Sequence, residues 1–132
     1  MPNWCDTGVN LFSAQFASDR DAVLARAIQA GVSHLLLIGS DLSESEQNIA
    51  FCQQHSNCFS TAGVHPHQAA QVDNNWLTRL SELLALPQVV AVGECGLDFN
   101  RDFSPRPIQQ QVFAEQLQLA KSSAKPVYLH ER

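Results

Sequence analysis

The residues of this chain that could carry chemistry stand in short polar segments, each directly after an apolar run. These segments are Asp6–Asn10, Gly63–His67, Gly93–Asp98 and His130–Arg132. In parallel α/β folds, ligands bind beyond the carboxyl ends of the strands, where segments of this kind meet. A carboxylate and histidines that converge there can bind a divalent cation through oxygen and imidazole nitrogen. The spacing therefore predicts a metal site at one edge of a parallel sheet.

Glu94 and His130 are the strongest candidates for ligands of that metal. Glu94 follows the apolar run Val89–Val92, and a carboxylate next to such a run requires a partner. His130 ends an apolar segment close to the carboxyl terminus. His65 and His67 flank a proline, so a simple turn is the competing interpretation, above all for His67.

Alternating polar and apolar patterns predict the elements that must position these residues. Strands are expected at 5–9, 32–38, 58–64, 89–93 and 126–130, and helices at 18–30, 41–54, 73–86 and 107–122. Gly31 stands where the first helix should end, Asp41 with Glu44 forms an N-cap pattern, and Asp73 can cap the third helix. In the last helix, the residues expected to face inward are Val112, Phe113, Leu117 and Ala120.

The regular alternation of strands and helices indicates a parallel sheet with right-handed crossovers. A five-stranded doubly wound sheet fits the length, whereas a TIM (β/α)8 barrel needs roughly 250 residues. Because no helix follows the last strand to cover it, we favour the barrel, with about its first five strands and four helices in a single incomplete domain at 1–132. Inner-face residues such as Val90, Val92 and Val127 would then lack a packed layer. We therefore expect self-association through the open sheet edge.

The composition limits the function without defining it. The chain has 132 residues, 45% of them hydrophobic and 16% charged, and its formal net charge is −5. The absence of a basic stripe argues against broad binding to duplex nucleic acid, although a metal can supply the positive charge that a phosphodiester needs. Four cysteines without CxxC spacing, and no apolar leader, predict a cytoplasmic protein with reduced thiols. No apolar run is long enough to span a membrane.

Three strings of this sequence closely resemble signatures of the TatD family of metal-dependent DNases. They are Gly-Val-His65-Pro-His67, Gly93-Glu94-Cys-Gly-Leu-Asp98-Phe and Leu-His130-Glu-Arg132, of which the second is the most specific. The resemblance implies a TIM barrel that hydrolyses DNA as a 3′–5′ exonuclease, prefers single strands and also accepts RNA. It implies a divalent metal cofactor, Mg²⁺ first, with Zn²⁺ and Mn²⁺ as alternatives.

The same resemblance implies a role for each matching residue. Glu94 would be the catalytic metal ligand and His130 a second ligand; His65 and His67 would contact the substrate phosphate; Asp6, Asp98 and Arg132 would support them. Most of the family carries a His-x-His pair after the first strand, where this chain has Gly8 and Asn10. We therefore expect one metal position to be weakened. Further ligands expected from later strands have no counterpart in 132 residues, so we expect little nuclease activity from these residues alone.

Two other hypotheses remain at the level of the sequence. The first is a non-catalytic α/β module that assembles through its open sheet edge. The second is a zinc-dependent amidohydrolase, since related barrels use the same ligands on other bonds. The missing His-x-His pair argues against the amidohydrolase.

Overall fold

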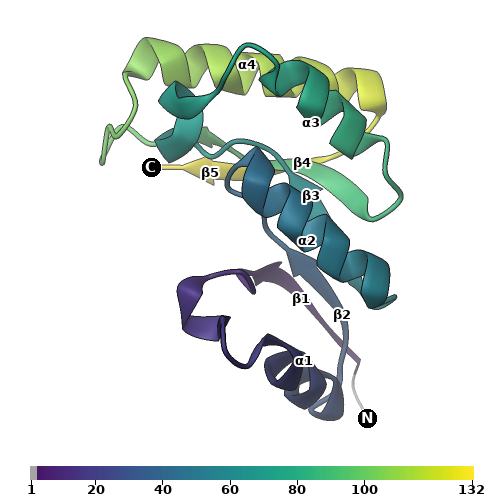
Figure 1. Ribbon diagram of the computed structural model, residues 1–132. Helices are drawn as coiled ribbons and strands as arrows, with labels where there is room; N and C mark the ends of the chain where they lie inside the picture. The colour runs from purple at the N-terminus through teal and green to yellow at the C-terminus, as the bar shows by residue number, and fades with distance from the viewer. Residues whose placement is uncertain (1–2) are drawn as a thin grey trace.

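The computed structural model describes residues 3–132, which form a curved parallel sheet with helices packed against it (Figure 1). In chain order the elements are β1 (Trp4–Val9), η1 (Ala14–Phe16), α1 (Arg20–Gln29), β2 (Val32–Leu37), α2 (Leu42–Gln54), β3 (Cys58–Ala62), η2 (Pro66–Gln71), α3 (Trp76–Leu84), β4 (Val89–Leu97), α4 (Arg106–Ser123) and β5 (Val127–Glu131). The short 3-10 helices η1 and η2 were not predicted. None of the helices in the described part is long and apolar enough to cross a membrane.

The order of the strands decides between the two folds that the sequence left open. The sheet runs β1-β2-β3-β4-β5, and every neighbouring pair is parallel. A doubly wound sheet reverses its order part way, which this sheet does not. Successive right-handed crossovers in one direction place all the helices on one face, as in the wall of a (β/α)8 barrel. The predicted barrel is therefore confirmed, with five of its strands in this chain.

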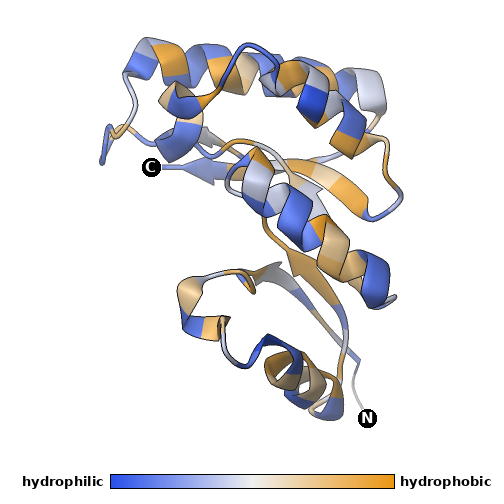
Figure 2. Ribbon diagram, in the orientation of Figure 1, coloured by the Kyte–Doolittle hydropathy of each residue, from blue (hydrophilic) through white to orange (hydrophobic). Residues whose placement is uncertain are grey.

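Two apolar clusters hold the helices on that face of the sheet. One joins α1 and α2 to β2 and contains Leu24, Leu35 and Leu37. The larger one joins α3 and α4 to β3 and β4 and includes Leu80 and Val112. Figure 2 shows the hydrophobic residues along β2 and the hydrophilic end of β5 at the carboxyl terminus. The polar strand end thus lies outside the core.

The predicted inner-face residues Val92 and Val127 are corrected by this packing. Val92 is fully buried in the larger cluster and Val127 packs against it, whereas Val90 is 38% exposed as expected. The cause is a bulge: Ser60 pairs with Val89 and Thr61 with Ala91, so Val90 has no partner on β3. An extra residue shifts the alternation of side chains by one, which turns Val92 towards the helices.

The helix ends agree with the prediction in two cases and differ in a third. The Asp41 carboxylate accepts a hydrogen bond from the Glu44 N–H at 2.7 Å, and Gly31 follows α1 with φ 101°. The N-cap of α3 is Asn75 rather than Asp73. The Asp73 carboxylate instead accepts from the Asn75 N–H at 2.9 Å, so it stabilises the turn before the helix.

The inward face of α4 was predicted only in part. Val112 and Ala120 are buried, but Leu117 is 42% exposed. Gln109 and Gln116 take the place of apolar residues on the buried face, with 1% and 0% of their surface exposed. Their amide groups bond to the loops beyond β3 and β4, which an apolar side chain could not do.

Candidate metal centre

Three histidines from two parts of the chain meet at the carboxyl ends of the strands. His65 and His67 belong to the turn at the start of η2, and His130 lies in β5. Their ligand atoms all lie within 4.8 Å of one another. The ring centroid of His65 is 4.3 Å from that of His67 and 4.4 Å from that of His130. The sequence placed these residues at the same edge of the sheet, and the structure brings them together.

Asp98 lies beneath this histidine cluster and is 1% exposed. Its Oδ2 is 2.9 Å from Nε2 of both His67 and His130, and its Oδ1 accepts from the Asn100 and Arg101 N–H groups. The Arg101 N–H chiefly, helped by the two histidines, holds the pKa of this carboxyl well below its usual range, although burial opposes the shift. An ionised Asp98 only accepts hydrogen bonds, so both histidines carry a proton on Nε2.

Glu94 reaches the cluster because it stands in a second bulge of β4. Gly93 pairs with Tyr128 and Cys95 with Leu129, so Glu94 has no partner residue on β5. Bulges of this kind re-aim side chains next to functional sites. The Glu94 Oε2 lies 3.2 Å from His130 Nδ1.

The contact between Glu94 and His130 tests whether these residues fit a metal ion. With Nε2 donating to Asp98, a neutral His130 directs the lone pair of Nδ1 at a carboxylate oxygen. Two acceptors at 3.2 Å require a proton or a cation between them. Two ligand atoms that bind one metal ion at right angles, at metal–ligand distances of about 2.0–2.2 Å, lie about 3 Å from each other. Carboxylate and imidazole together fit a divalent cation.

A backbone hydrogen bond, rather than Asp98, fixes the proton of His65. Its Nδ1 accepts the backbone N–H of His67 at 3.0 Å, so a neutral His65 carries its proton on Nε2. Burial first, and then the adjacent His130 and His67 imidazoles, together lower the pKa of His65 to about 4, although Asp98 opposes the shift. His65 is therefore neutral at pH 7 and presents an N–H donor, which suits a phosphate oxygen better than a metal.

Two buried glutamines of α4 hold the loops that carry these side chains. Gln116 accepts from the Val64 N–H at 2.9 Å and donates to the Val64 carbonyl at 3.0 Å. Gln109 does the same for Asp98, at 2.8 and 3.2 Å. Sequence reasoning missed both residues. The available signal was their spacing of seven, in line with Val112, which places them on one face of the helix.

Asp6 and Arg132 bond to parts of the chain other than the histidines. Asp6 is exposed in β1, and its carboxylate accepts from the Gly8 N–H at 3.1 Å. Arg132 pairs through its backbone with Leu97 and Phe99, and its side chain is exposed. Within residues 3–132, neither side chain forms a hydrogen bond or ion pair with the histidines.

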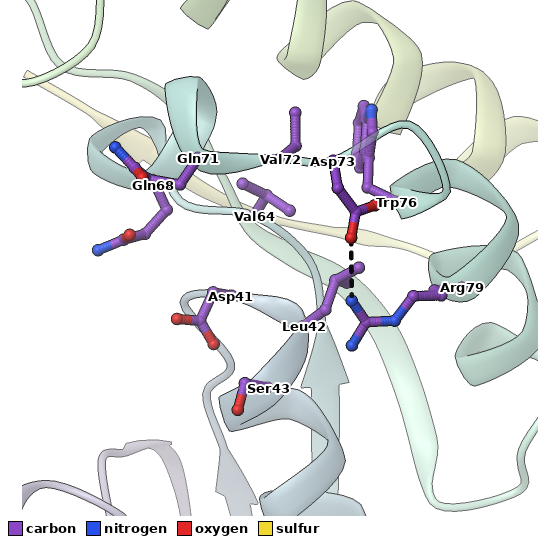
Figure 3. Close-up of a pocket in the computed structure, with 10 residues that line it drawn as sticks. All are labelled: Asp41, Leu42, Ser43, Val64, Gln68, Gln71, Val72, Asp73, Trp76 and Arg79. Atoms are coloured by element: carbon purple, nitrogen blue, oxygen red, sulfur yellow. Dashed lines mark ion pairs between the residues drawn. The ribbon is translucent and has the colours of Figure 1, made fainter.

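A pocket of about 200 Å³ lies between η2 and the starts of α2 and α3 (Figure 3). Arg79 is the cation in its wall, and this guanidinium is 2.6 Å from Glu46 and 3.8 Å from Asp73. Asp41, also in the wall, is engaged in capping α2. With its guanidinium neutralised and two carboxylates in the lining, the pocket is poorly suited to phosphate.

Comparison with known proteins finds relatives along almost the whole chain. A family model described as TatD related DNase matches residues 5–132. The chain is 53% identical over 127 residues to a protein of Enterobacter lignolyticus named 3′-5′ ssDNA/RNA exonuclease TatD, an alignment that covers 96% of this chain and 49% of the relative. The chain thus spans about half the length of the curated relatives it matches.

Solved structures show the same fold. A TatD homologue from Escherichia coli superposes with a TM-score of 0.88 at 32% identity, over 98% of this chain and 51% of that one. A TatD family hydrolase from Entamoeba histolytica gives a TM-score of 0.89 at 27% identity, over 98% and 50%. The family match extends through all three strings that carry Glu94, His65, His67 and His130. This chain belongs to the TatD related DNase family.

Proposed function

We propose that the protein hydrolyses phosphodiester bonds in single-stranded DNA, and in RNA, as a 3′–5′ exonuclease. The observation that carries the proposal is the arrangement of Glu94 and His130 around buried Asp98, with Glu94 Oε2 and His130 Nδ1 3.2 Å apart. The name of the Enterobacter relative supports the substrate and the direction of cleavage. Because the chain covers about half of that relative, we assign the activity to the full-length protein, meaning this chain and whatever its reading frame adds after Arg132.

In this proposal, some residues of the cluster bind the metal and others bind the substrate. Glu94 and His130 would hold a divalent cation, Mg²⁺ in this proposal, with Zn²⁺ and Mn²⁺ as alternatives. Such a cation would supply an activated water and positive charge to offset the charge that develops on the phosphate. Asp98 fixes the ring of His130 so that Nδ1 faces Glu94. His65, with His67 beside it, donates its Nε2 proton to a phosphate oxygen of the substrate.

The test is a nuclease assay on the full-length protein with single-stranded DNA and added Mg²⁺. Glu94→Ala should abolish hydrolysis, because it removes the anionic ligand of the metal. Glu82→Ala, which removes an exposed carboxylate of α3, is the matched control and should be silent. Wild-type activity in Glu94→Ala would show that the metal assignment is wrong.

The role of His65 has its own signature in the same assay. His65→Ala should mainly raise KM, since a contact to the phosphate is made in the ground state as well as in the transition state. A loss confined to kcat would instead place His65 on the group that reacts. The two variants thus separate the metal side of the site from the substrate side.

We further propose that residues 1–132 alone self-associate through their open edges. The two edge strands carry exposed apolar side chains, Trp4 at 59% and Leu129 at 61%. Pairing of such edges is the common outcome when nothing covers them. Size-exclusion chromatography of the 132 residues should show oligomers, and a sharp monomeric peak with cooperative unfolding would contradict this.

A further inference from the structure

The loop between β4 and α4 presents an aromatic side chain at the rim of the histidine cluster. Phe103 is 61% exposed, although it is among the most apolar residues of the chain. The centroid of its ring is 4.7 Å from that of His67, and the two planes are inclined by 77°. Phe103 thus borders the site while most of its surface is exposed to solvent.

The exposure of Phe103 is enforced by the bonds of the next residue. Ser104 is fully buried; its hydroxyl donates to the His67 carbonyl at 3.2 Å and accepts from the Ala70 N–H at 3.0 Å. The Ser104 carbonyl accepts from Gln109 Nε2 at 2.7 Å. These bonds tie the loop to η2 and α4 on both sides. Phe103 is therefore held in place beside His67 before any ligand arrives.

The cations around this loop are not equivalent. Arg106 is paired with Asp102 at 2.9 Å and lies over the ring of Phe99. Arg101, whose guanidinium carbon lies over the Phe103 ring at 5.9 Å from its centroid, forms no ion pair within residues 3–132. An exposed aromatic face next to an unpaired guanidinium is the combination by which proteins bind single-stranded nucleic acid.

We propose that Phe103 is a stacking platform for one nucleobase next to the scissile phosphate, with Arg101 at the adjoining phosphate. This inference rests on the proposed nuclease function and adds to it the source of the preference for single strands. A base within a duplex has both faces covered by its neighbours, whereas a base of a single strand offers a face to Phe103. Stacking tolerates every base, so the platform selects strandedness without selecting sequence.

The first experiment measures binding by the full-length protein in the Glu94→Ala background, which prevents hydrolysis. The probe is a fluorescein-labelled oligothymidylate, followed by fluorescence anisotropy. Phe103→Ala and Phe103→Leu should each raise Kd by about 5- to 100-fold, and Phe103→Trp should restore affinity. Leu117→Ala, an exposed apolar residue on α4, is the control. Wild-type affinity in Phe103→Leu would overturn the proposal, because leucine is apolar but has no aromatic face.

The second experiment locates the base. Oligonucleotides with one abasic site at successive positions from the 3′ end are compared on the parent and on Phe103→Ala. At a single position, an abasic site should weaken binding to the parent protein about as much as the substitution Phe103→Ala does. The same abasic site should not weaken binding to the Phe103→Ala protein any further. Equal losses in both proteins at every position would overturn the proposal.

The two hypotheses fail in different ways. If the wild-type protein hydrolyses single-stranded DNA while every Phe103 variant binds normally, stacking is excluded and the nuclease function stands. If the wild-type protein hydrolyses no nucleic acid, the nuclease function itself fails.

Discussion

The two ends of this sheet are built differently although both are parallel strands of one barrel wall. In β1 every residue before Val9 is exposed, and Asp6 bonds only to the backbone of its own strand. In β4 most residues are buried, and the strand carries Glu94 and leads into Asp98. Polar residues follow both strands in the sequence. They form a network with the histidines only at the β4 end.

The helices account for the difference. Helix α1 buries a single residue, Leu24. Helix α4 is 18 residues long and buries Gln109 and Gln116 beside its apolar residues, so it provides hydrogen-bond partners for the loops above it. A strand end alone places a residue to within a few ångströms. The helix behind it fixes the backbone that determines where the side chain points.

The largest expected contrast is between two acid-to-amide substitutions in the full-length protein. Asp98→Asn replaces the acceptor of His67 and His130 by a group that also donates, which disturbs the ring that faces Glu94. Activity should fall about 10- to 100-fold, as for other residues that orient metal ligands. Asp6→Asn, at the β1 end, should keep activity within about twofold. Both are measured as kcat/KM on single-stranded DNA.

A large loss in Asp6→Asn would remove the contrast between the two ends. It would mean that Asp6 takes part in the site. Equal metal affinity in Asp98→Asn and wild type, measured by calorimetry, would show that Asp98 acts on something other than the ligand geometry.

The sequence predicted which strand ends would meet. His65 and His67 follow β3, Glu94 and His130 lie in the carboxyl-terminal halves of β4 and β5, and parallel strands present these ends at one edge of the sheet. This part of the site depends only on the order and direction of the elements. The apolar periodicity of the sequence is sufficient for that.

The details that orient the side chains could not be read in the same way. Both bulges of β4, at Val90 and Glu94, depend on how β4 registers with its neighbours, which no local pattern records. The hydrophobic pattern also placed Leu117 inside, where the structure exposes it, and gave no reason to place Gln116 inside, where the structure buries it. Gln116 is buried because the Val64 backbone has polar groups to satisfy, and that demand comes from a distant part of the chain.

We expect an effect of intermediate size on stability when the backbone groups of Val64 lose their hydrogen-bond partners. Gln116→Leu keeps a similar volume but leaves the Val64 N–H and carbonyl without their partners. Buried polar groups without partners cost about 1–3 kcal/mol, so the free energy of unfolding should fall by that amount. Gln118→Leu, on the exposed face of the same helix, should change it by less than about 0.5 kcal/mol. Urea denaturation of the full-length protein compares the two, and equal losses would show that the helix tolerates leucine poorly for a reason unrelated to Val64.

The smallest expected effect concerns pH and the metal-free protein. Burial and the neighbouring imidazoles lower the pKa of His65 from 6.5 to about 4. Between these values the unfolded chain binds a proton that the folded protein does not. Stability therefore falls as the pH decreases from about 6.5 to about 4, and none of this term is present above 6.5. Because His65 is only half-buried, we expect the loss to be on the order of 1 kcal/mol.

This pH window is separate from that of the acid below the cluster. The depressed pKa of Asp98 contributes stability that is lost only as the pH falls below the ordinary carboxyl range, so it does not affect the interval from 6.5 to 4. Urea denaturation in EDTA at pH 7 and pH 5 should therefore show a smaller pH dependence in His65→Asn than in the wild type. His34 is an exposed histidine of β2, towards the other end of the sheet, and His34→Asn should retain the wild-type pH dependence of stability. If His65→Asn keeps the full slope as well, the protons are taken up elsewhere, and His65 is not the neutral donor that its contact with His67 implies.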